Sequence, residues 1–277
     1  MRWLLHLLAI LILTVLTQVG GVVYLLCLPL TTAIRRRLRG WAGWSSGVVC
    51  FLAVLIITSL WVVPPLARRA GRVPLPLAAS AELPLGPGRW FTIVANRRYV
   101  RPELLAVVRG VARRAAERYP GTELRYLDAN FPFLTGFPLL PHRSHDDGEK
   151  LDLSFLYLDA GGGRRNVSPG FLGYGFTEDP RAGEADQPAI CAQNGYWQYG
   201  LLTWLARQRG DLRFDAGANA WLVGALTADR RVRKVFVEPH LKARLGYGGN
   251  AKVRYHGCAA VPGPDLGGMT ICQFGNF

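Results

Sequence analysis

The chain begins with two long apolar stretches. The first runs from about residue 3 to 34 and the second from about residue 46 to 66, and the segment between them holds four arginines and two tryptophans. Each stretch is long enough to cross a bilayer as a helix, and the first is too long for the core of a signal peptide. We therefore expect a two-helix transmembrane hairpin within residues 1–72, with a tilt or kink at Gly20-Gly21 in its first helix.

The charges of this region indicate its orientation. Residues 1–72 contain eight arginines and no acidic residue, and the arginines are densest in the short segment between the two apolar stretches. Short arginine-rich loops stay in the cytoplasm, so the chain after residue 66 is expected outside. The resulting prediction is a bacterial inner-membrane protein whose C-terminal domain is periplasmic and whose first partner is the lipid bilayer.

The pattern changes after residue 72. Residues 73–88 are rich in proline, leucine and alanine, which predicts an extended linker, and residues 89–277 then form the outer domain. Short apolar segments without βαβ repetition favour an α+β fold, a small mixed or antiparallel sheet with flanking helices. Residues 161–187 are glycine-rich and predict a long loop. The predicted helices are 102–119, 196–207, 219–227 and 239–245, and the predicted strands are 123–127, 151–157, 235–237, 252–255 and 270–274.

Composition adds two constraints. The net charge is +14, but the outer part carries only +6 of it, and no basic stripe alternates with stacking aromatic residues, so no nucleic-acid partner is expected. Cys27 and Cys50 lie in the apolar stretches, whereas an oxidising compartment would allow one disulfide among Cys191, Cys258 and Cys272. The sequence leaves the pairing open.

The candidate metal-binding residues follow the predicted helix 102–119 in the chain. Asp152 opens an alternating apolar run, and His145 precedes a loop that returns to it. A loop of this length can bring an imidazole and a carboxylate to one ion, and nitrogen with oxygen ligands suits zinc. His142, three residues before His145, could support the ligands from behind, but a solvated loop residue is the preferred interpretation.

The run HRSHDDGEKLDLSF, residues 142–155, resembles the S-H-x-x-G-x-x-x-D signature of the LAS-type zinc peptidases, specifically the penicillin-insensitive murein endopeptidases. Residues 226–245 and 252–261 resemble two further segments of that family. The resemblance implies that His145 and Asp152 are zinc ligands and that the partner outside the membrane is peptidoglycan, in which an amide bond is hydrolysed.

The chain departs from the family at its end. The family closes with a histidine-rich strand that supplies a third ligand and a general base, whereas Met269 and Ile271 stand at those positions here. One interpretation is a substitute ligand, with His256 preferred over His240 and Cys272. A second is an inactive domain, and a third is a shifted reading frame near the C-terminus. Zinc is therefore the expected cofactor, with His145, Asp152 and His256 as its ligands.

The sequence thus predicts a membrane-anchored peptidoglycan amide hydrolase of the zinc endopeptidase type. The alternative is a catalytically inactive wall-binding or envelope-assembly module on the same fold. No residue is assigned as the catalytic base.

Overall fold

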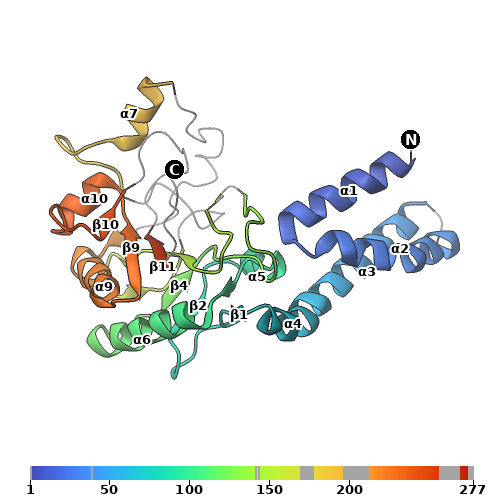
Figure 1. Cartoon of the computed structure of the whole chain (residues 1–277), viewed down its shortest axis with the longest axis horizontal. Coiled ribbons are helices and arrows are strands. Elements are labelled where there is room, and N and C mark those ends of the chain that lie inside the picture. The colour runs from blue at the N-terminus through green and yellow to red at the C-terminus, as the bar shows by residue number, and fades with distance from the viewer. Residues whose placement is uncertain are drawn as a thin grey trace.

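The computed structural model describes residues 2–38, 40–140, 142, 144–168, 178–195, 212–255 and 269–273. Its N-terminal part is helical and its C-terminal part mixes helices with sheets, so the predicted α+β domain is confirmed at that level (Figure 1). The N-terminal helices are α1 (Arg2–Thr17), α2 (Gly20–Arg37), α3 (Gly40–Ile57) and α4 (Val63–Arg69), and a π-helical turn η1 (Thr58–Val62) joins α3 to α4.

One helix among the described residues is long and apolar enough to cross a membrane. It is the continuous helix Gly40–Arg69 of 30 residues, made of α3, η1 and α4. The first apolar stretch instead divides into α1 with 16 residues and α2 with 18, and arginines occupy the last turn of α2. The transmembrane hairpin of two spanning helices is therefore not confirmed.

The break between α1 and α2 lies at Gln18. Gln18 lies in the left-handed region with φ 64°, which ends the helix two residues before the expected kink at Gly20-Gly21. The Gln18 side chain accepts a hydrogen bond from the backbone N–H of Phe133 at 2.8 Å. A contact with the C-terminal domain thus accompanies the break, which no pattern within the apolar stretch could indicate.

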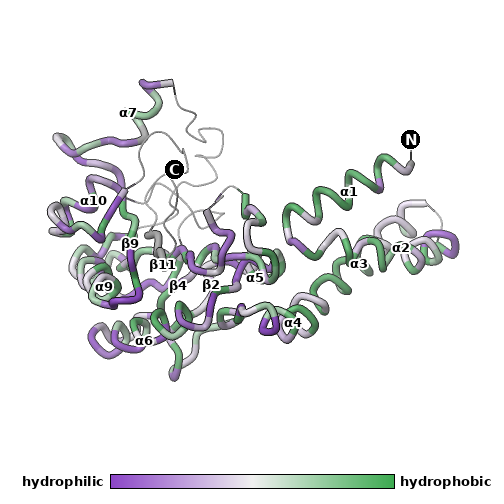
Figure 2. The backbone as a smooth tube through the Cα atoms, in the orientation of Figure 1, coloured by the Kyte–Doolittle hydropathy of each residue, from purple (hydrophilic) through white to green (hydrophobic). Residues whose placement is uncertain are grey.

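The helices expose much of their apolar surface. Figure 2 shows hydrophobic residues along most of α1, α2 and α3, and side chains such as Trp3, Trp41 and Trp61 are largely exposed. Contiguous apolar surface of this kind marks contact with a membrane or another protein. The α2 and α3 helices lie side by side, and α1 meets α2 at an angle (Figure 1).

The main sheet of the C-terminal domain has six strands in the order β10-β9-β11-β5-β4-β2. The first four strands of this order run parallel, β4 is antiparallel to β5, and β2 is parallel to β4. The strands are β2 (Leu85–Pro87), β4 (Leu124–Tyr126), β5 (Lys150–Leu153), β9 (Val232–Phe236), β10 (Val253–Arg254) and β11 (Met269–Gln273).

Two helices complete the core against this sheet. Helix α6 (Pro102–Arg118) has proline in its first turn and buries one apolar face, and α9 (Ala216–Ala228) packs against α6 and β9. The remaining elements are α5 (Trp90–Val94), α7 (Gln187–Gln193), α10 (Pro239–Arg244), a pair of β1 (Val73–Pro74) with β3 (Tyr99–Val100), and a small sheet of β6 (Tyr157–Leu158), β7 (Arg164–Arg165) and β8 (Arg213–Phe214).

Most of the helices and strands predicted for this domain are present in the structure. The predicted helices at 102–119, 219–227 and 239–245 correspond to α6, α9 and α10, and the five predicted strands correspond to β4, β5 with β6, β9, β10 and β11. Within the predicted loop 161–187, β7 is a short strand. The predicted helix 196–207 lies outside the described residues.

The segment 73–88 is extended but is not a separate linker. Strand β1 pairs with β3, β2 forms an edge of the main sheet, and Leu75 and Leu85 are fully buried in the core. The folded domain therefore begins directly after α4, because Leu75 and Leu85 pack in its core and β1 and β2 pair with its strands.

This packing predicts a stability difference within the segment. Leu85→Ala, at a side chain with 0% exposure, should lower the free energy of unfolding by about 2–5 kcal/mol, because it removes buried contacts and leaves a cavity. Leu77→Ala, at a side chain with 49% exposure, should change it by no more than about 0.5 kcal/mol. Denaturant unfolding of the full chain in micelles measures both, and equal effects would contradict the packing described.

Candidate metal centre

The site is built where β4 and β5 continue their pairing. Beyond β4, the Asp152 N–H donates to the Asp128 carbonyl at 2.8 Å, and the Leu127 N–H donates to the Asp152 carbonyl at 2.8 Å. These bonds place Asp152 beside the residues that follow β4. The connection from Asn130 to β5 then carries His142 and His145 back over the same strand.

A buried asparagine and a glycine fix the return of this connection. Asn130 donates through Nδ2 to the carbonyls of Tyr99 and Lys150, and its Oδ1 accepts from the Gly148 N–H. Gly148 has φ +86°, a backbone conformation that glycine adopts without a Cβ clash. The chain can therefore turn sharply into β5, which brings the histidines next to Asp152.

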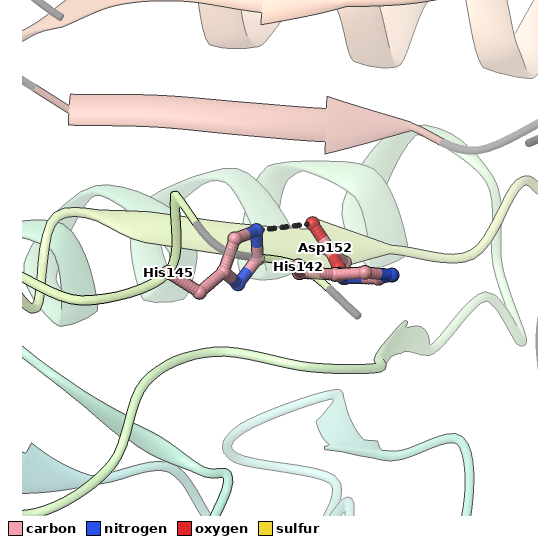
Figure 3. Close-up of side chains that lie close together, drawn as sticks. All are labelled: His142, His145 and Asp152. Carbon is pink, nitrogen blue, oxygen red and sulfur yellow. Dashed lines mark hydrogen bonds and ion pairs between the residues drawn. The ribbon is translucent and has the colours of Figure 1, made fainter. Parts of the chain in front are cut away.

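Three side chains converge on one point (Figure 3). His142 Nδ1 lies 2.8 Å from Asp152 Oδ2, and His145 Nε2 lies 3.1 Å from Asp152 Oδ1. One potential ligand atom from each of the three residues lies within 4.8 Å of the others. The exposed fractions are 6% for His142, 1% for His145 and 0% for Asp152, so the group is shielded from bulk water.

The orientation of His145 follows from its second nitrogen. His145 Nδ1 donates to the Ala129 carbonyl at 2.6 Å, so Nε2 is the nitrogen that faces Asp152. With an oxygen acceptor beside each ring nitrogen, the ring is satisfied either as an imidazolium or with a cation bound at Nε2. A backbone carbonyl behind a histidine is also the usual arrangement that orients a metal ligand.

An ion pair lies behind His142. Arg97 Nη1 donates to Asp128 Oδ2 at 2.8 Å, and the same carboxylate oxygen lies 3.9 Å from His142 Nδ1. Arg97 also donates to the Leu140 carbonyl, two residues before His142. Arg97 thus joins the start of the site, at Asp128, to the chain that carries His142.

In the absence of a metal ion, the electrostatics favour protonated His145 beside ionised Asp152. Burial lowers the pKa of His145, but the charge and hydrogen bond of Asp152 outweigh it, so the pKa is raised overall. Burial likewise raises the pKa of Asp152, yet the two histidines outweigh it and leave the pKa lowered. The site therefore concentrates negative charge that protons or a metal ion neutralise.

The donor set fits a metal ion. Ligand atoms about 2.0–2.1 Å from a tetrahedral zinc ion lie about 3.3 Å from one another. The ligand atoms of the three residues lie within 4.8 Å of one another, so a bound ion would draw the side chains closer together. Two imidazoles and one carboxylate are also a ligand set that leaves a fourth position open. The residues present therefore fit a divalent cation, and the geometry alone does not identify zinc.

The structure brings together two of the three residues predicted as ligands. His145 and Asp152 meet, whereas His256 lies outside the described residues. His240, another candidate for a third ligand, instead bonds through Nε2 to the Glu178 carbonyl at 2.8 Å. For Cys272, the structure gives the backbone position, directly across from Asp152 in the β11–β5 pairing.

The interpretation of His142 as a solvated loop residue is wrong. It is buried and completes the group, because the loop folds inward at both histidines and His145 N–H donates to the His142 carbonyl at 3.0 Å. The signal available in the sequence was a second histidine three residues from the first. Spacing within a loop does not show which side chains turn inward, so the signal was ambiguous.

The structure describes the state of three of the cysteines. Cys191 is disulfide-bonded, whereas Cys27 and Cys50 are free. The partner of Cys191 lies among residues whose side chains are not described, so the pairing among the outer cysteines stays open.

Comparisons with known proteins add no relative. No protein-family model, curated protein or solved structure matches the chain. The site therefore rests on its own geometry and chemistry.

The pKa shifts predict how acid affects the site. Below the pKa that His145 has in the unfolded chain, protonated His145 stabilises the metal-free protein. This stabilisation is lost as pH rises through the raised pKa that His145 has in the folded protein. Above the pKa that Asp152 has in the unfolded chain, ionised Asp152 stabilises the folded protein. This stabilisation is lost as pH falls through the lowered pKa that Asp152 has in the folded protein.

Zn²⁺ binding should weaken as pH falls, because a proton and a metal ion compete for Nε2 of His145. The Zn²⁺ affinity of the full chain should fall about tenfold for each pH unit below the folded pKa of His145. Competition with a chromophoric chelator across mildly acidic and neutral pH measures this slope. A flat affinity profile would contradict His145 as a ligand.

Proposed function

We propose that this chain is a membrane-anchored, zinc-dependent hydrolase of amide bonds in the cross-links of peptidoglycan. The observation that carries the proposal is the buried group of His142, His145 and Asp152, with donor atoms within 4.8 Å of one another. The S-H-x-x-G-x-x-x-D signature, which His145 and Asp152 share with zinc murein endopeptidases, gives the proposal its reaction and substrate.

Each residue of the site has a defined role in this proposal. His145 binds the cation through Nε2 while the Ala129 carbonyl holds its Nδ1–H, and Asp152 supplies the anionic ligand. His142 binds through Nδ1, the nitrogen that faces Asp152. A bound zinc ion would lower the pKa of a water molecule at its fourth position and polarise the scissile carbonyl.

The charged residues behind the ligands set their orientation. The Asp128 carboxylate lies beside His142, and Arg97 neutralises that carboxylate while it holds the Leu140 carbonyl. Removal of such outer partners commonly weakens metal affinity by 10- to 100-fold. Arg97 and Asp128 therefore keep the ligands in place and do not touch the reacting atoms.

The membrane part supports the proposed location. Helix Gly40–Arg69 serves as the anchor, and the arginines at the end of α2 lie on the cytoplasmic side by the positive-inside rule. This orientation puts the C-terminal domain in the periplasm of a bacterium, next to the wall. The net charge of +6 beyond residue 72 suits an anionic polymer.

A second candidate is an inactive wall-binding or envelope-assembly module, and one observation favours it. Strand β11 runs parallel beside β5, which carries Asp152, and its sequence from Met269 to Gln273 contains no histidine. In the family that the signature resembles, the last strand supplies a ligand and the general base. Here His142 takes the place of a third ligand, but no described residue takes the place of that base.

The proposal predicts that metal and activity depend on the same residues. The full chain in micelles should retain about one zinc ion per chain after dialysis and should release peptide products from purified cross-linked peptidoglycan. His145→Ala and Asp152→Asn should lose both properties, because each removes a ligand.

The matched control is His240→Gln, which changes a buried histidine outside the group and should keep both properties. Zinc without product release would support the inactive module, since the site would then bind metal and lack catalysis. A parent chain without zinc would overturn the proposal.

A further inference from the structure

The helical N-terminal part and the metal-site connection touch each other through specific polar contacts. The connection leaves Asn130, passes Phe131, Phe133 and Thr135, and returns through His145 and Asp146 to β5. Two residues of the N-terminal part hold it, Gln18 between α1 and α2, and Arg72 directly after α4. Figure 1 shows α4 leading straight into β1 at this point, with no long linker between the helices and the domain.

Arg72 joins both ends of the connection. Its guanidinium donates to the carbonyl of Phe131, to Thr135 Oγ1 at 3.1 Å and to the carbonyl of Asp146 at 2.9 Å. Asp146 follows His145 in the chain, so Arg72 holds the residue next to a proposed ligand. The same Asp146 carbonyl accepts the Gly136 N–H at 3.1 Å, which ties the outgoing and returning parts together.

Arg72 is in turn fixed to the helix. Its backbone N–H donates to the Ala67 carbonyl at 2.9 Å, and Ala67 is a fully buried residue of α4. Only 3% of Arg72 is exposed, and burial lowers the pKa of its guanidinium, while the nearby Asp147 charge opposes this shift. Burying a cation is costly unless its hydrogen bonds are made, so these contacts strongly restrict where the connection can lie.

Gln18 makes the second contact at the cost of backbone strain. Gln18 and Asn96 are the non-glycine residues with positive φ, at 64° and 57°, among the described part of the chain. Both reach across the same boundary: Gln18 accepts from Phe133 N–H, and Asn96 donates to Ser59 Oγ at 2.9 Å in the π-helical turn. Strained residues persist where the surrounding contacts require them, and here those contacts join the helices to the domain.

We propose that Arg72 and Gln18 are positioning residues for the metal centre, so that the docked N-terminal helices set its metal affinity. This inference rests on the proposed function only in requiring that the His142–His145–Asp152 group binds a metal ion. A movement of α1 or α4 pulls on Phe133 or on Asp146, and through them it displaces His145 relative to Asp152. The helices therefore act as a structural part of the site as well as an anchor.

The test measures metal binding by the full chain in micelles. Arg72→Gln removes the charge and most of the three contacts, and Gln18→Gly removes the side-chain contact while it relieves the strained backbone. Each variant should raise the Kd for Zn²⁺ about tenfold or more, as loss of an outer partner of a ligand does. Arg72→Lys, which keeps a cation, should recover part of the affinity.

Arg98→Gln is the matched control. Arg98 is also 3% exposed and donates to a carbonyl, that of Leu75 at 2.6 Å, but no contact to the metal-site connection accompanies it among the described residues. Its Kd should stay within about twofold of the parent. Replacement of zinc by Co²⁺ gives a second readout, because its visible absorption reports coordination geometry, and the absorption should change in Arg72→Gln and Gln18→Gly but not in Arg98→Gln.

The outcomes separate the two proposals. Parent-like Kd and Co²⁺ absorption in Arg72→Gln or in a folded Gln18→Gly would overturn the positioning role and leave the proposed function intact. An equal loss in Arg98→Gln would overturn it too, since the effect would then be general destabilisation. A parent chain that binds neither ion would overturn both proposals.

Discussion

The Asp152 carboxylate lies where water does not reach it, and two imidazoles converge on its two oxygens. An ionised carboxylate in such a place needs compensating positive charge, which protonated histidine or a bound cation supplies. The main-chain pairing that carries β4 on past Tyr126 fixes Asp152, and Asn130 fixes the turn that brings the histidines to it. The site is therefore a consequence of how β4 and β5 pair.

The N-terminal helices are tied to the same connection. The connection that carries the histidines buries Phe131 and Leu139, and polar contacts from Arg97 on one side and Arg72 on the other hold it as well. Arg97 belongs to the domain, whereas Arg72 continues from the helix that is a candidate membrane span. The helices and the connection are thus coupled through the hydrogen bonds of Arg72 to backbone carbonyls and of the Phe133 N–H to Gln18, and Phe133 also packs against buried residues of the helices.

Sequence patterns predicted the elements whose signals are local. Helix α6 has proline at its start and an apolar stripe at helical spacing, and the run that contains Asp152 includes strand β5, although β5 begins at Lys150 and is buried at every position. Patterns failed where a distant contact decides. Gln18 breaks the first apolar stretch through its bond to Phe133, the segment 73–88 is packed against the sheet, and His142 turns inward because of Asp152 and Asp128. In each case the deciding partner lies far along the chain or in a loop without periodicity.

The central claim is that one metal ion is bound by two histidines and an aspartate. X-ray absorption at the zinc edge of the purified full chain tests it most directly, because imidazole, carboxylate and thiolate ligands scatter differently. We predict two imidazole ligands and oxygen ligands at about 2.0–2.2 Å, without sulfur. A sulfur shell at about 2.3 Å, or an ion with no imidazole ligand, would contradict the account.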